Sequence, residues 1–72
     1  MKYPKLNDEE WDKIKKTIKK QALKNAGPRG SESNIDLFFD WRVAESHRDE
    51  RVRIQARKRI FKLAYDQNSS NP

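Results

Sequence analysis

The fold of this chain depends on its most apolar stretch, which reads Ser33-Asn34-Ile35-Asp36-Leu37-Phe38-Phe39-Asp40-Trp41-Arg42-Val43-Ala44. Seven of the ten residues from Ile35 to Ala44 are hydrophobic, and they include two of the three Phe and one of the two Trp. The segments on either side are basic, and each carries an apolar stripe that must be buried against another element. This stretch is the largest candidate for that role.

The stretch has two periodicities. Alternating apolar residues fit a half-buried strand. Helical spacing instead places Phe38 and Phe39 on one face and Leu37 and Trp41 on the opposite face. We favour a helix, because Ser33 can cap it and because a lone strand would leave its backbone groups without partners. If the stretch were a strand, it would pair with its own copy in a dimer. On the helical interpretation we expect both Phe side chains in the core.

A long helix is predicted before this stretch, over residues 8–26. Asn7 can cap it, and Leu6 stands where a hydrophobic staple would pack against the first turns. Gly27 and Pro28 end it, since glycine accepts a left-handed conformation and proline cannot continue a helix. The apolar residues that recur with helical spacing are Trp11, Ile14, Ile18 and Ala22.

Two further helices are predicted, over residues 34–45 and 47–66, with Ser46 as the cap of the second. No Gly or Pro separates them, so a single helix over 34–66 is an alternative. We therefore expect an all-α fold, a small three-helix domain with helices at about 8–26, 34–45 and 47–66.

The domain is expected to end at residue 66. Residues 67–72 are polar, and we expect them to form a disordered tail. Because helices 34–45 and 47–66 are apolar on two sides, more than one thin helix can cover, the chain is also a candidate homodimer.

The composition limits the possible classes of protein. The 72 residues contain no cysteine, so disulfides and thiolate metal sites are excluded. Charged residues make up 39% of the chain and the net charge is +6. The sequence shows neither a signal peptide nor an apolar run of membrane-spanning length, so we expect a cytoplasmic, soluble protein without a membrane partner.

Catalytic chemistry is not expected. His47 is the only histidine, and its neighbour Ser46 cannot face it on a helix. Asp36 and Asp40 are one turn apart, a spacing that is common for solvated acids and is too little for a metal site. We therefore expect no enzyme activity, no metal, no cofactor and no small-molecule substrate.

The best functional signal is a strip of basic residues along the last predicted helix, at spacings of three and four. Clustered positive charge is what phosphate neutralisation on nucleic acid requires, and arginine suits bidentate phosphate contacts. The strip predicts a regulatory protein that contacts nucleic acid or an acidic protein surface. Its members are Arg48, Arg51, Gln55, Lys58, Arg59 and Lys62, and we call them the basic strip.

A second signal is the excess of apolar and aromatic residues over what a three-helix core needs. Aromatic residues are typical of protein interfaces. The alternative function is therefore a protein-binding module or inhibitor, as in phage-encoded or antitoxin-like proteins, which blocks a host protein that itself handles nucleic acid. The residues predicted for this interface are Leu37, Trp41, Ile54, Phe61 and Tyr65.

Overall fold

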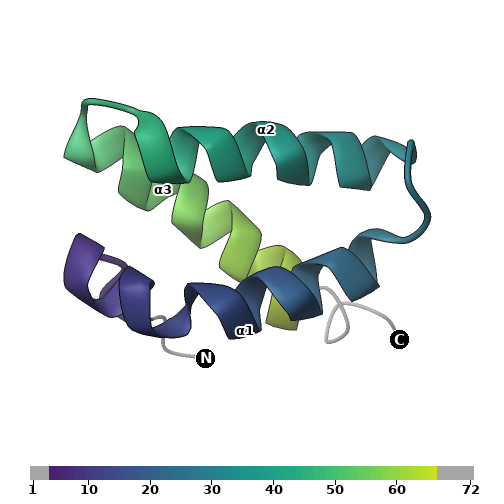
Figure 1. The fold of residues 1–72 in the computed structure, drawn as a ribbon, viewed down its shortest axis with the longest axis horizontal. Coiled ribbons are helices and arrows are strands. Elements are labelled where there is room, and N and C mark those ends of the chain that lie inside the picture. The colour runs from purple at the N-terminus through teal and green to yellow at the C-terminus, as the bar shows by residue number, and fades with distance from the viewer. Residues whose placement is uncertain (1–3, 67–72) are drawn as a thin grey trace.

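The structure is a computed structural model that describes residues 4–66, and it confirms the all-α, three-helix prediction (Figure 1). The helices are α1 (Asp8–Ala26), α2 (Glu32–Ser46) and α3 (Glu50–Phe61), and α3 continues into a π-helical turn, η1 (Lys62–Asp66). α1 and α2 run antiparallel, and α3 crosses diagonally from α2 to the end of α1. The strand alternative is wrong, and the predicted tail at 67–72 lies outside the described residues.

The first helix forms as its sequence predicts, over 8–26. The Asn7 side chain accepts a hydrogen bond from the backbone N–H of Glu10 at 3.0 Å, which satisfies one of the unpaired donors at the helix start. Leu6 and Trp11, the two positions of the staple, are both buried in the core. This local pattern therefore sets both the start of α1 and the entry of the chain into the domain.

The loop between α1 and α2 is closed by Ser31. Its Oγ accepts a hydrogen bond from the N–H of Asn34 at 3.2 Å and donates one to the carbonyl oxygen of Ala26 at 2.9 Å. Ser31 is therefore the cap of α2, not Ser33, and the helix begins at Glu32, two residues earlier than predicted. The two glycines of the loop have φ values of 89° and 92°, a conformation that other residues rarely adopt.

A short break separates α2 from α3, so the alternative of one helix over 34–66 is wrong. The break is at His47, whose backbone is extended, and its Nδ1 accepts a hydrogen bond from the N–H of Asp49 at 2.9 Å. Asp49 caps α3 by accepting a hydrogen bond from the N–H of Arg51 at 2.9 Å. The predicted cap, Ser46, is instead the last residue of α2. The carboxylate of Asp49 suits the start of α3, because the helix dipole favours negative charge at the N-terminus of a helix.

The C-terminal end of the domain is held by α1. The last carbonyl groups of a helix have no partner within it. Here Asn25 supplies one, since its Nδ2 donates hydrogen bonds to the carbonyl oxygens of Leu63 and Ala64 at 3.0 and 2.8 Å. The predicted helix over 47–66 thus begins at Glu50 and changes to π-helical geometry over its last five residues.

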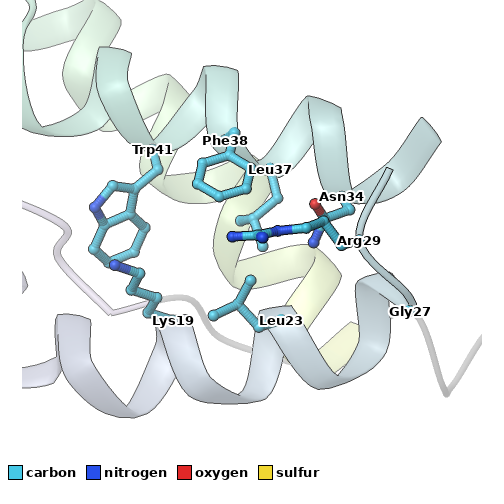
Figure 2. Close-up of a pocket in the computed structure, with 8 residues that line it drawn as sticks. All are labelled: Lys19, Leu23, Gly27, Arg29, Asn34, Leu37, Phe38 and Trp41. Atoms are coloured by element: carbon cyan, nitrogen blue, oxygen red, sulfur yellow. The ribbon is translucent and has the colours of Figure 1, made fainter. Parts of the chain in front are cut away.

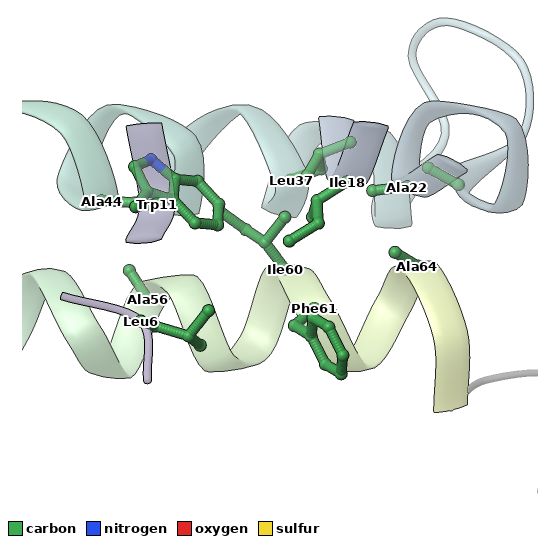
Figure 3. Packing of buried hydrophobic residues seen from close by; sticks show 11 residues of the cluster. Leu6, Trp11, Ile18, Ala22, Leu37, Ala44, Ala56, Ile60, Phe61 and Ala64 are labelled. Atoms are coloured by element: carbon green, nitrogen blue, oxygen red, sulfur yellow. The ribbon is translucent and has the colours of Figure 1, made fainter. Parts of the chain in front are cut away.

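The core is built where the three helices meet (Figure 3). Five of its buried members are alanines, two on α1 and one each on α2, α3 and η1, and such small side chains let helices approach closely. Trp11, Ile18 and Ile60 are the largest fully buried side chains. The complete set of buried hydrophobic residues is Leu6, Trp11, Ile18, Ala22, Ala26, Leu37, Ala44, Ala56, Ile60, Phe61 and Ala64.

The prediction that Phe38 and Phe39 belong to the core is wrong. Their side chains are 53% and 69% exposed, and α2 instead turns Leu37 and Ala44 inward. Arg42 lies on the same helical face as the two Phe residues. Burying that face would also have buried the Arg42 guanidinium, at a free-energy cost that the opposite face avoids.

Arg57 has a structural role that the sequence did not predict. It is 2% exposed, although it carries a full charge. Its Nε donates to the carbonyl oxygen of Ala44 at 3.1 Å, Nη1 to that of Leu6 at 2.7 Å, and Nη2 to Asp8 Oδ1 at 2.7 Å. The guanidinium also lies 5.4 Å from the centre of the Trp11 ring. One side chain therefore connects α3 to the N-terminal segment, to the start of α1 and to the end of α2.

We expect substitutions of Arg57 to be strongly destabilising. Arg57→Lys keeps the charge, but a single ammonium cannot reach three acceptors arranged around a planar fork. Each buried carbonyl left without a donor costs about 1–3 kcal/mol, so Arg57→Lys should lower the free energy of unfolding by at least about 2 kcal/mol. Urea unfolding followed by circular dichroism measures it. Arg51→Lys, at an exposed position of the same helix, is the control and should change little.

The Asp8–Arg57 contact predicts a pH dependence of stability. The hydrogen bond from Arg57, and then the charge of Arg53, hold the pKa of Asp8 below its ordinary value of 3.8. Its stabilising effect is therefore complete above the unfolded pKa and is lost as pH falls through the lower, folded pKa. Asp8→Asn should unfold at lower urea than wild type at neutral pH, and the difference should shrink as the pH falls below the ordinary pKa of the carboxyl group and vanish once Asp8 is protonated in the folded state. Glu9→Gln, in the same helical turn, should not show a difference of this size; an equal effect would contradict the assignment.

Candidate interaction surfaces

The basic strip is a surface feature, since all six of its members are exposed. Arg51, Gln55 and Lys58 lie on α3, and Lys62 continues the line into η1. Arg48 does not, because it lies in the break before α3 and not on the helix. The structure thus places a shorter line of exposed residues on α3 than the sequence suggested.

One charge of the strip is compensated inside the fold. Arg59 contacts Asp40 of α2, with Nε and Nη2 each 3.1 Å from Asp40 Oδ1. No comparable salt bridge forms at Arg51 or Lys58 among the described residues. Arg51 and Lys58, together with Lys62, therefore carry the part of the strip that is directed to solvent.

The five predicted interface residues do not form one surface, although Leu37 and Trp41 line the same groove and Phe61 contacts Tyr65. Leu37 and Phe61 are buried, so neither is part of the exposed surface, and each contributes only to the lining of a cavity. Tyr65 is 36% exposed and its ring lies 4.9 Å from that of Phe61, beside a cavity next to α1. Ile54 lines a separate cavity at the N-terminal segment, and Trp41 faces a groove between α1 and α2. The five residues thus line three different cavities.

A different set of apolar residues is exposed. Ile35 is 57% exposed, and with Phe38 and Phe39 it follows the i, i+3, i+4 spacing that places side chains on one helical face. Arg42 extends this line by one turn and is also exposed. We call these four residues the outer face of α2. The position of Arg42 was a signal in the sequence that this face would remain outside.

A groove of about 400 Å³ lies between α1 and α2 (Figure 2). Leu23 of α1 and Phe38 of α2 face each other across it, with Leu37 between them. Leu23 is 37% exposed, so the groove adds apolar surface to the outer face of α2. We call it the α1–α2 groove, and the residues that line it are Lys19, Leu23, Gly27, Arg29, Asn34, Leu37, Phe38 and Trp41.

The Trp41 end of the groove is positioned by contacts with α1. The rings of Trp11 and Trp41 are 5.2 Å apart at an angle of 48°, and Lys19 Nζ lies 5.1 Å from the centre of the Trp41 ring. Trp11 in turn donates from Nε1 to Glu45 Oε2 at 3.2 Å. The Trp41 ring, which is tilted against Trp11, and the Lys19 ammonium thus form the wall of the groove at this end, where the cation is attracted to the face of the ring.

The charges beside the groove are unbalanced. Lys15 Nζ lies 3.2 Å from Asp12 and 3.6 Å from Glu45. Hydrogen bonding to Asp12, and then the charge of Glu45, raise the pKa of this ammonium. Lys19 and Arg29 form no salt bridge among the described residues, and no carboxylate lines the groove. The groove therefore carries two uncompensated positive charges.

Within the described residues, no group of three or more His, Asp or Glu side chains is placed to hold a metal ion. His47 serves the break between α2 and α3, as described above. Asp36 is exposed, whereas Asp40 is occupied by Arg59. No helix in this part of the chain is long and apolar enough to cross a membrane.

Comparison with known proteins does not add to this description: no protein-family model matches the chain, and no curated protein or solved structure is significantly similar to it.

Proposed function

We propose that this protein is a non-catalytic binding module that attaches to another protein through the outer face of α2. The observation that carries the proposal is the exposure of Ile35, Phe38 and Phe39, by 57%, 53% and 69%, on one face of a single helix. Contiguous exposed apolar residues with polar neighbours are typical of protein-binding sites, and aromatic side chains dominate binding energy. A module of this kind acts by covering a surface of its partner, which is how an inhibitor or regulator works.

A different protein is a better partner than a second copy of the chain. Each copy carries a net charge of +6, and like net charges oppose association at long range. An acidic partner would instead be attracted. Self-association through the outer face of α2 remains an outcome that the experiment below distinguishes.

A second candidate function is contact with nucleic acid through the basic strip. The supporting observation is that Arg51 and Lys58 are exposed on one line of α3 and form no salt bridge among the described residues. Phosphate contacts require accessible cations of this kind, and they dominate nucleic-acid affinity. The two functions are compatible, since they use different helices.

We expect Phe38→Ser combined with Phe39→Ser to abolish binding of the protein partner. Truncating a central aromatic contact typically removes about 2 kcal/mol or more of binding free energy. The measurement is affinity capture by immobilised protein from a nuclease-treated lysate of the source organism, with the retained proteins identified by mass spectrometry. A partner retained by wild type and lost by this variant is the expected result.

Three controls accompany this experiment. Both Phe side chains are exposed, so the free energy of unfolding of the variant should stay within about 0.5 kcal/mol of the wild-type value for each substituted site. Arg51→Glu with Lys58→Glu should keep the partner. Sedimentation of wild type should show a monomer, whereas a dimer abolished by the Phe variant would identify a second copy as the occupant. Equal retention by all variants would contradict the proposal.

For the nucleic-acid function, Arg51→Glu with Lys58→Glu should weaken binding to duplex DNA or RNA and make it less sensitive to salt. Each lost phosphate contact lowers the slope of log affinity against log salt by about one unit, so the double variant should lose roughly two. Fluorescence anisotropy at several salt concentrations measures the slope. Lys16→Glu with Lys20→Glu on α1 changes the net charge equally and should affect the slope less. Identical slopes for the two variants would exclude the strip as the contact site.

A further inference from the structure

The α1–α2 groove has the shape of a binding site for an additional helix that does not belong to this chain. α1 and α2 run antiparallel on its two sides, and α3 covers them from behind (Figures 1 and 2). The open side therefore offers a helix a trough between two helices, as α3 occupies on the covered side. Its volume of about 400 Å³ is enough for bulky apolar side chains. No strand occurs in the described residues, so a partner cannot extend a sheet there.

The apolar part of the groove is central. Leu23 and Phe38 form its two sides, and both are accessible, at 37% and 53% exposure. Leu37 lies between them and is buried, so it forms the floor. An occupying side chain such as Leu or Phe would contact all three. It would remove from water apolar surface that the domain itself leaves uncovered, which is the main source of favourable binding free energy.

The polar part of the groove is positive at its Trp41 end and over its middle, where the Arg29 guanidinium lies between Leu23 and Phe38 in the view of Figure 2. Lys19 lies at the Trp41 end, and Arg29 extends over the groove from the α1–α2 loop (Figure 2). Lys20 and Lys16, about one and two turns before Leu23, add exposed positive charge on the same side of α1. With no carboxylate lining the groove, an occupant that supplies acidic groups on both sides of its apolar stripe would be complementary.

We propose that the α1–α2 groove binds an acidic amphipathic helix of a partner protein. Its apolar stripe inserts a Leu or Phe side chain between Leu23 and Phe38, and flanking Asp or Glu residues meet Lys19 and Arg29. This inference rests on the proposed protein-binding function and specifies the chemistry of the partner. A helix laid into a hydrophobic groove is a common form of peptide recognition, read as anchors at i, i+3, i+4 and i+7.

The experiment is selection from a displayed library of helical peptides in which apolar, acidic and basic residues occur equally at every position. We expect enriched sequences to carry a Leu- or Phe-containing stripe flanked by Asp and Glu. A synthetic consensus peptide and a counterpart with every acid replaced by Lys are then titrated against the full chain by fluorescence anisotropy. The basic counterpart should bind at least about tenfold more weakly.

Charge exchange tests the contacts directly. Lys19→Glu with Arg29→Glu should weaken the acidic peptide by about tenfold or more and should strengthen the basic counterpart. Leu23→Asp should abolish binding of both, and the milder Leu23→Ser confirms the result if the Asp variant melts early. Lys5→Glu with Lys13→Glu is the matched control, because it changes the net charge equally at two exposed residues that do not line the groove, and it should leave peptide affinity within about twofold. Phe39→Ser is measured in parallel to separate the groove from the outer face of α2, since Phe39 belongs to that face and does not line the groove.

The outcomes separate this inference from the function it rests on. Enrichment without acidic residues, no enrichment at all, or binding indifferent to Leu23→Asp would overturn the groove assignment. Binding that depends on Phe39 and not on Leu23 would also overturn it, while leaving the outer face of α2 as the protein-binding site. If the peptides bind the groove but the natural partner survives Phe38→Ser with Phe39→Ser, the proposed function fails on its own test.

Discussion

The buried guanidinium of Arg57 is the interaction on which the rest of the structure depends. A buried charge is tolerated only when its hydrogen-bonding groups have partners, and here each partner comes from a different segment. Leu6 belongs to the N-terminal segment, Asp8 to the start of α1 and Ala44 to α2. The core is small and rich in alanine, so apolar packing alone specifies the arrangement of the helices weakly. The polar network supplies the register that the core does not.

The orientation of α2 follows from this constraint. The carbonyl oxygen of Ala44 meets Arg57 only if that end of α2 lies close against α3, and Ala44 and Ala56 have the small side chains that allow the approach. Asp40 supports the same orientation by pairing with Arg59 of α3. Once this side of α2 faces inward, its other apolar side must face solvent. The exposed outer face of α2 is therefore a consequence of how the core is held together.

The basic strip differs from the two apolar surfaces, the outer face of α2 and the α1–α2 groove, in the distance over which it acts. The cations of the basic strip act over a distance set by ionic strength, about 10 Å at 0.1 M salt. The outer face of α2 and the α1–α2 groove act only on contact, through burial of apolar surface. In the function we propose, positive charge would attract an acidic partner and the aromatic residues of α2 would hold it. Lys19 and Arg29 are not part of the basic strip, but they combine both kinds of interaction, since they border apolar side chains of the groove and form no salt bridge among the described residues.

By itself, the sequence determined the features that arise from neighbouring residues. The cap at Asn7, the staple of Leu6 and Trp11, and the end of α1 at Gly27 are each written within a few positions, because they depend on local backbone geometry. The basic strip was also evident as a surface, since charged residues at helical spacing without apolar neighbours stay solvated.

Tertiary structure alone decided which side of α2 became the core. Both of its sides are apolar, and the single charge of Arg42 beside the two Phe residues was too weak a signal to separate them, so Phe38 and Phe39 were wrongly predicted to be buried. The choice was made by Arg57, whose acceptors lie as far as 51 positions away in the sequence. No local pattern shows that a buried charged residue will find three hydrogen-bond partners in segments far away in the sequence. The α1–α2 groove could not be predicted from the sequence for the same reason. It is formed by residues of α1 and α2 that only long-range packing brings together.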